Sequence, residues 1–249
     1  MTVNDIYSFL NEFAPFDTAC DFDNAGLLIG GKDAEVDKCI VALDCTEAVV
    51  DEAIQKGAQL IITHHPVIFS GLKSVLADSL VYRLIENNIS VISAHTNLDI
   101  ADGGVNDCLA KALGLKEIKK IVCDDGFSFK CGQLNDDISP EAFAKYVGEK
   151  LNFSPRFTVG KKEIKTVAVC GGSGGDLFPT AIKNGCDALV TADVKHNFFI
   201  DAAAQGFTLI DCGHFNTEDV VIEPLKELLS EKFGDVQFFT NHTPYIHCL

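Results

Sequence analysis

An apolar segment that ends in two imidazoles, Leu60-Ile61-Ile62-Thr63-His64-His65-Pro66, is the feature around which the first half of the chain is arranged. Four aliphatic or β-branched residues predict a buried strand, and Pro66 cannot donate to a sheet, so the strand ends there. His64 and His65 then lie at a carboxyl edge, where open α/β sheets bind ligands and where neutral imidazole can bind a metal. Adjacent residues of an extended chain point to opposite sides, which suits two metal ions better than one. A solvated strand end is the alternative.

The residues around this strand predict alternating strands and helices. The chain opens with apolar residues at helical spacing after Asn4, and Pro15 ends that helix. A second helix is expected at Glu47–Lys56, with Thr46 as its N-cap and Gly57 just after its end. The whole pattern is βαβαβ, typical of a parallel, doubly wound sheet, with its other elements at Cys39–Leu43, Leu60–Thr63, Leu76–Glu86 and Ser90–Ala94.

The second half of the chain repeats this pattern. AIQKGAQLIIT at 53–63 matches AIKNGCDALVT at 181–191, and both halves have a strand that ends in H-x-N-x-(D/E), at 95–99 and 214–218. Such self-similarity indicates a duplicated α/β unit. The sequence therefore predicts two similar, interlinked α/β domains with mainly parallel sheets, at 1–125 and 126–249, and a metal site between them. Its further elements are expected at Ser128–Leu134, Pro140–Leu151, Arg156–Val159, Thr166–Cys170, Pro179–Asn184, Phe198–Gln205 and Thr208–Asp211.

The composition restricts the class of partner. The sequence of 249 residues has 20 Lys and Arg and 36 Asp and Glu. The net charge of −16 repels phosphate backbones and anionic membranes, so we expect neither nucleic acid nor a membrane as a partner. Ten cysteines, from Cys20 to Cys248, form no CxxC pair, so we expect reduced thiols. We expect no signal peptide, and the sequence has no apolar run of about 18 residues, so no membrane span is expected and the cytoplasm is the expected compartment.

Residues that could bind metal follow the predicted strands. Nitrogen and oxygen donors of this kind suit Zn, Fe, Mn, Ni or Co better than Cu(I) or an iron–sulfur cluster. With bridging carboxylates, such a set could hold two ions about 3.5–4 Å apart. The candidates are His64, His65, His95, Asp99, His214 and Glu218.

Several of these residues have plainer interpretations. We expect His95 to lie beside the metal rather than on it. Asp99 could cap the following segment, and His214 with Glu218 could be a surface pair. The counterpart of the two-histidine loop in the second half has lost its imidazoles, so we expect Asp193, Lys195 and His196 to line the pocket instead. The run GGSGG at 171–175 lacks the Lys-Ser/Thr of a P-loop and is interpreted as a tight turn.

The motifs DNAGLLIG, THHP, AHTNLD, GGVND and GHFNTE together resemble the Nif-three-like dinuclear-metal family, the GTP cyclohydrolase 1 type 2 homologues. The resemblance spans essentially the whole chain and implies toroidal homohexamers of two-domain α/β subunits, here in a short form without an inserted middle domain. It also implies a cofactor of two divalent metal ions per subunit. The implied ligands are His64, His65, Asp99, His214 and Glu218, with His95 beside the site.

Two functions are compatible with these observations. The first is a metal-dependent hydrolase that resembles GTP cyclohydrolase 1 type 2 homologues and acts on a small molecule. The second is a non-catalytic, metal-binding or regulatory ring that recruits partners.

Overall fold

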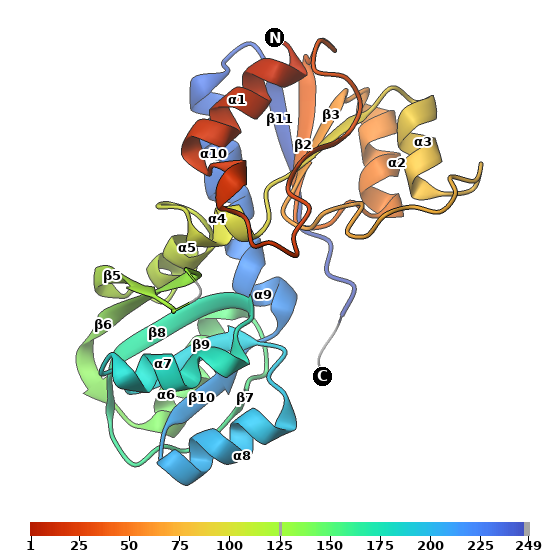
Figure 1. Ribbon diagram of the computed structural model, residues 1–249. Coiled ribbons are helices and arrows are strands. Elements are labelled where there is room, and N and C mark those ends of the chain that lie inside the picture. Colours follow the sequence, from red (N-terminus) through yellow and green to blue (C-terminus); the bar gives the residue numbers. More distant parts are fainter. Residues whose placement is uncertain (125, 247–249) are drawn as a thin grey trace. The chain divides into compact units, whose positions relative to one another are not determined.

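The computed structural model describes residues 1–124 and 126–246, and these fall into two compact units (Figure 1). Unit 1 is Met1–Asp102 with Ile222–Thr243, and unit 2 is Gly103–Val221 with 244–246. These bounds differ from the expected 1–125 and 126–249. Asp125 lies outside the described residues, and the strands on either side of it pair with each other inside unit 2. The repeat gave no indication that the C-terminal segment returns to unit 1.

Unit 1 contains a five-stranded sheet in the order β1-β4-β3-β2-β11. All neighbouring strands are parallel except β1, which runs antiparallel to β4. The strands are β1 (Gly26–Ile29), β2 (Lys38–Ala42), β3 (Leu60–Thr63), β4 (Ser90–Ser93) and β11 (Gln237–Asn241). The helices are α1 (Val3–Phe13), α2 (Glu47–Lys56), α3 (Leu80–Glu86), α4 (Thr96–Ile100) and α10 (Ile222–Lys232), with a 3-10 turn, η1, at Phe16–Thr18.

Both faces of this sheet are covered by helices. Helices α1 and α10 lie on one face and α2 and α3 on the other (Figure 1). Phe9 of α1 meets Phe233, just after α10, edge to face at 5.5 Å. Strand β3 is buried along its whole length because it is central in a doubly covered sheet. Its continuous apolar sequence has this physical cause.

Unit 2 contains a six-stranded sheet in the order β5-β6-β8-β9-β10-β7. Its centre, β8-β9-β10, is parallel, and the other pairings are antiparallel. The strands are β5 (Lys116–Val122), β6 (Ser128–Ile138), β7 (Arg156–Phe157), β8 (Ile164–Ser173), β9 (Ala188–Ala192) and β10 (Thr208–Asp211). The helices are α5 (Val105–Ala112), α6 (Pro140–Leu151), α7 (Phe178–Lys183), α8 (His196–Gln205) and α9 (His214–Glu218), with 3-10 turns η2 (Gly175–Leu177) and η3 (Asp219–Val221).

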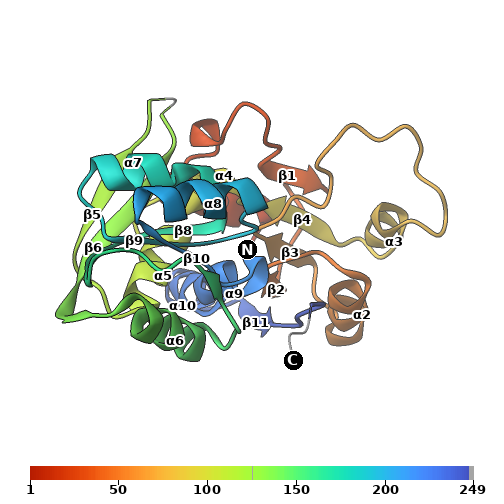
Figure 2. The same cartoon turned by 90° about the horizontal axis from the view of Figure 1, so that it is seen from below.

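The two faces of this sheet carry different cores. Figure 2 shows α7 and α8 side by side on one face and α6 on the other. Val167 and Val169 pack with residues of α5 and α6, whereas Ala168 and Cys170 pack with α7 and α8. This division follows from the two-residue alternation of a strand.

The predicted repeat is present in the topology of the two sheets. The order β2-β3-β4 in unit 1 corresponds to β8-β9-β10 in unit 2, and each series ends at an antiparallel edge strand, β1 or β7. Along the chain, a five-residue helix follows the last parallel strand of each series: α4 follows β4, and α9 follows β10. Two similar α/β units are thus confirmed, with parallel pairings in most of the unit 1 sheet and at the centre of the unit 2 sheet.

Within the described part of the chain, no helix has the length and apolar character needed to cross a membrane.

Candidate metal centre

His64 is fixed at the end of β3 by the neighbouring strand. Its Nδ1 donates to the carbonyl oxygen of Ala94, at 2.9 Å, and its side chain is fully buried. A carbonyl can only accept, so the proton of the neutral ring is on Nδ1 and Nε2 carries the lone pair. Asp99 Oδ1 lies 3.6 Å from this Nε2.

His65 has the same arrangement with a different acceptor. Its Nδ1 donates to Asp44 Oδ1 at 2.7 Å, and Asp44 follows β2, the strand next to β3. The hydroxyl of Thr63 donates to the His65 carbonyl at 2.8 Å and so fixes the turn between the two histidines. Parallel neighbouring strands therefore supply both the imidazole and its acceptor.

His95 lies in the same group, held by a buried carboxylate. Its Nδ1 donates to Asp23 Oδ1 at 2.7 Å, and the backbone N–H and hydroxyl of Thr96 donate to Asp23 Oδ2 at 3.0 and 2.5 Å. Burial raises the pKa of Asp23, but the hydrogen bonds from His95 and Thr96 outweigh it and hold that pKa well below its ordinary value. Asp23 stays ionised and orients the ring.

These three imidazoles form one cluster. Their ring centroids lie 5.0 to 5.6 Å apart, and one nitrogen from each can be chosen so that all lie within 4.8 Å of one another. In each ring an acceptor occupies Nδ1 and leaves Nε2 for a ligand, the usual arrangement of metal-binding histidines. The donor set of unit 1 fits a transition metal ion.

Asp99 is placed by helix α4 rather than acting as a cap. Asn97 accepts from the His95 N–H at 2.9 Å and donates to the Ala14 carbonyl at 2.7 Å, which fixes the start of the helix. The Asp99 side chain is nearly buried and lies inside α4. The capping interpretation of this residue is therefore wrong.

In unit 2, the counterpart is built from Asp193, just after β9, and from two residues of helix α9. His214 Nδ1 donates to Asp193 Oδ2 at 2.7 Å, and His214 Nε2 lies 3.0 Å from Glu218 Oε2, one helical turn along α9. Glu218 is buried, whereas His214 is about one-third exposed. Asp193 thus orients His214 as Asp23 orients His95. Beyond this pair, His196 is an exposed residue at the start of α8, after Lys195.

Two glycines make room for Glu218. A Cβ on Gly172 would lie 2.2 Å from Glu218 Oε1, and one on Gly171 would lie 3.2 Å from Glu218 Cγ. Gly172 also has a φ of +62°, which favours glycine. Gly171 and Gly172 belong to β8, so a tight turn does not account for them. They let a carboxylate approach the backbone.

Asn106, a residue that sequence reasoning did not select, supports the same strand end. Its Oδ1 accepts from the Gly171 N–H at 2.8 Å, and the side chain is fully buried. Its Nδ2 has no hydrogen-bond acceptor among residues 1–124 and 126–246. Asn106 belongs to the GGVND motif, which could have identified it, but no role was predicted for that motif.

Asp211 holds the loops around His214. Its carboxylate accepts from the backbone N–H groups of Val194 at 3.0 Å and Gly213 at 3.2 Å, and it pairs with Arg156. Asp193 and His214 are neighbours in sequence of these two N–H groups. One buried side chain therefore sets the position of both.

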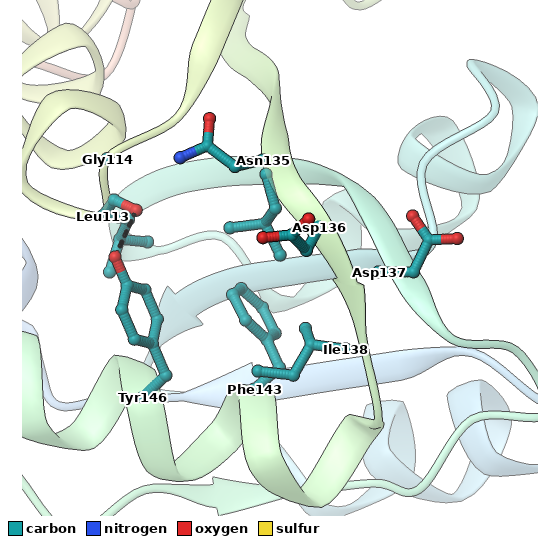
Figure 3. A pocket seen from close by; sticks show the side chains of 9 residues that line it. Leu113, Gly114, Asn135, Asp136, Asp137, Ile138, Phe143 and Tyr146 are labelled. Carbon is teal, nitrogen blue, oxygen red and sulfur yellow. Dashed lines mark hydrogen bonds between the residues drawn. The ribbon is translucent and has the colours of Figure 1, made fainter.

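Unit 2 also has a pocket of 260 Å³ between α5, β6 and α6 (Figure 3). Tyr146 closes one side by donating to the Leu113 carbonyl at 2.9 Å. Asp136 and Asp137 lie on its β6 side. None of the candidate metal ligands lines it.

The fold and the donor set define an α/β protein with a duplicated unit and a cluster of candidate metal ligands. The model of the Duf34/NIF3 (NGG1p interacting factor 3) family matches residues 1–244, and the chain belongs to this family.

Relatives and solved structures agree with this assignment. A GTP cyclohydrolase 1 type 2 homolog of Clostridium perfringens is 34% identical over 97% of this chain and 96% of its own length. One from Clostridium acetobutylicum is 36% identical over 88% of this chain and 85% of its own. The crystal structure of a Staphylococcus aureus hypothetical protein superposes with a TM-score of 0.92 at 34% identity, covering 100% of this chain and 99% of that one. Reduced HcgD from Methanocaldococcus jannaschii gives 0.80 at 28%, covering 96% and 97%.

Proposed function

We propose that this chain is a dinuclear metal-binding protein and a metal-dependent hydrolase of small molecules, as in the GTP cyclohydrolase 1 type 2 homologues it resembles. The observation that carries the proposal is the cluster of His64, His65 and His95, in which every Nδ1 is held by an acceptor. An imidazole that only caps a solvated strand end has no need of a dedicated acceptor. The proposed ligands are His64, His65, Asp99, His214 and Glu218.

The proposed ligands differ in the number of metal ions that each can bind. Each imidazole offers one nitrogen, so it can serve one ion, whereas the carboxylates of Asp99 and Glu218 can bridge two. When bound, two divalent ions (Zn, Fe, Mn, Ni or Co) lower the pKa of water and stabilise negative charge on a substrate. Asp23, Asp44 and Asp193 keep the imidazoles oriented.

The second candidate function is a metal-binding ring that recruits partners without turnover. A cytoplasmic homohexamer with a toroidal shape, which we infer from the family resemblance, serves either function. Sedimentation tests the assembly, and a single 26.9 kDa species at micromolar concentration contradicts it.

Metal content tests the dinuclear proposal. Elemental analysis of protein purified without chelator should give more than one equivalent of metal per chain. A ratio that stays at one after soaking in metal contradicts it. His64→Ala is the control, because it removes one proposed ligand from a buried position.

Turnover and stability together separate the two functions. We expect metal-loaded protein to hydrolyse at least one substrate among nucleotides, phosphate esters and amides, and Glu218→Gln to reduce turnover much more than the melting temperature. If metal instead holds the fold, chelation and Glu218→Gln should both lower the melting temperature sharply. A large melting shift without turnover on any substrate class would reject the enzyme and favour the ring.

A further inference from the structure

An aromatic side chain lies beside the imidazole cluster of unit 1 without being one of the candidate ligands. The ring centroid of Phe69 lies 6.2 Å from that of His95, and the two ring planes are 80° apart. This is an edge-to-face contact, at a separation within the range of about 4.5–7 Å that aromatic pairs prefer. Both residues belong to unit 1. A ring the size of an imidazole can therefore pack against Phe69 at the edge of the cluster.

Phe69 is exposed although the residues before it are held by the core. Val67 and Ile68 pack against the buried cluster of unit 1 that contains Ile61 and Leu84. Phe69 itself is 52% exposed. Its contact with His95 therefore leaves about half of its surface open to a ligand, on a segment whose path is set by its neighbours.

Two consecutive residues hold both sides of the contact between Phe69 and His95. Asp23 Oδ1 accepts from His95 Nδ1 at 2.7 Å, and Asn24 Nδ2 donates to the carbonyl oxygen of Ile68 at 2.5 Å. Ile68 directly precedes Phe69, so the backbone at Phe69 is tied to the same short segment that orients the imidazole. The phenyl ring is thus placed beside the cluster by the same residues that place a metal-site histidine.

The chemistry of Phe69 complements that of the candidate ligands. Imidazoles and carboxylates bind ions and polar atoms, whereas a phenyl ring offers only apolar surface and a π face. Small-molecule sites combine a few polar groups with apolar and aromatic walls. A flat ring that covers Phe69 removes apolar surface from water and adds an aromatic contact, and an aliphatic group of the same length gains only the first of these.

We propose that Phe69 packs against a planar aromatic ring of the substrate and so determines which small molecules bind. This inference rests on the proposed function, because the metal-bound part of the same molecule brings its ring to Phe69. The expected substrates are aromatic or heteroaromatic compounds whose reacting group lies a few bonds from the ring. Phe69 is a specificity-determining residue in this proposal and touches no reacting atom.

Two probes with the same metal-binding group test this role without any turnover. Acetohydroxamate and benzohydroxamate both chelate divalent ions through the hydroxamate, and only the second carries an aromatic ring. Calorimetric titration of the zinc-loaded, full-length protein gives the Kd of each probe. We expect benzohydroxamate to bind more tightly, and Phe69→Ala to reduce this preference by about 10-fold, the size of an aromatic contact together with its buried area. The Kd of acetohydroxamate should change by less than about 2-fold, because no ligand is altered.

Two further variants separate the aromatic face from the loop that carries it. Leu72→Ala is the matched control, because Leu72 lies in the same loop and is exposed to a similar degree, 50%, but has no ring. It should keep the preference for benzohydroxamate. Phe69→Tyr should also keep it, since the ring is retained, whereas Phe69→Leu should lose most of it despite a side chain that is still apolar.

Each other outcome overturns the proposal for a different reason. An unchanged preference in Phe69→Ala, with acetohydroxamate still bound, rejects the role of Phe69 and leaves the metal site standing. An equal loss of both probes makes Phe69 a support for His95 alone. A change in sedimentation in Phe69→Ala with the preference unchanged means that another copy of the chain covers the ring. If neither probe binds and the protein takes up no zinc, the proposed function fails, and this inference fails with it.

Discussion

The carboxylate of Glu218 lies against the backbone of Gly172, in space that the Cβ of any other residue would occupy: a Cβ at Gly172 would lie 2.2 Å from Glu218 Oε1. We therefore predict that Gly172→Ala displaces the Glu218 carboxylate and lowers metal affinity by about 10-fold or more. It should also lower the free energy of unfolding by about 1–2 kcal/mol, because alanine is strained at a φ of +62°. Metal titration and urea unfolding measure the two effects.

Gly57→Ala is the matched control for this prediction. Gly57 has a φ of +64°, and a Cβ there would meet nothing within 4 Å. It should show the same loss of stability with unchanged metal affinity. Equal metal affinities in the two variants would refute the proposed role of the Gly172 gap.

We predict that Asp23→Asn makes the protein less stable by about 2–3 kcal/mol at neutral pH, because the ionised carboxylate accepts three hydrogen bonds in a buried position. The pKa of Asp23 is lower in the folded protein than its ordinary value of 3.8. The unfolded chain thus binds this proton more tightly, and the contribution is complete above pH 3.8 and is lost as the pH falls towards the folded pKa. Unfolding free energies of both proteins against pH should converge below pH 3.8.

Asp44→Asn provides the comparison for Asp23. Asp44 also orients a histidine, but its side chain is about half exposed, so water can replace the lost interaction. Its effect on stability should be within about 1 kcal/mol. An equal loss in both variants would contradict the importance of burial.

His95→Ala should reduce metal affinity by about 10–100-fold, because we place His95 beside the site rather than on it. His64→Ala should have the larger effect, because it removes a proposed ligand. Calorimetric titration with one divalent metal compares the two variants. A loss in His95→Ala as large as that in His64→Ala would make His95 a ligand.

Asp211→Ala should lower the free energy of unfolding by about 1–3 kcal/mol for each N–H left without an acceptor, and should weaken metal binding through Asp193 and His214. Arg156→Ala is the control, because the Arg156 side chain is largely exposed and the ion pair contributes at most about 1 kcal/mol. Thermal melts and metal titration measure both. An unchanged metal affinity in Asp211→Ala would contradict the role of Asp211 in positioning Asp193 and His214.

The local pattern of the sequence predicted several elements closely. The helices Glu47–Lys56 and Pro140–Leu151 have the bounds that Thr46, Gly57 and Pro140 indicate, because capping residues act over one turn. Helix α3 begins at Leu80 rather than at the expected Leu76, since Ser79 is its N-cap.

Other features depend on contacts that a local pattern does not contain. The expected Thr166–Cys170 strand runs on to Ser173 as β8. Gly171 and Gly172, in this extension, leave space for the Glu218 side chain, a contact that is distant in sequence. The acceptors Asp23, Asp44 and Asp193 are up to 72 residues from their histidines, so no spacing rule finds them. The return of α10 and β11 to unit 1 likewise depends on contacts between residues that are far apart in sequence.

Because β11 follows Gly103–Val221 in the chain, the sheet of unit 1 is completed only after that part of unit 2 has been synthesised. The ribosome delivers all of Gly103–Val221 before it delivers Gln237–Asn241, which forms the outer edge of the first sheet. Until then the backbone N–H and C=O groups of β2 lie at an open edge, a template for pairing with other chains. Any stop between Val221 and Gln237 would release a protein that has all of Gly103–Val221 but whose unit 1 is prone to aggregate.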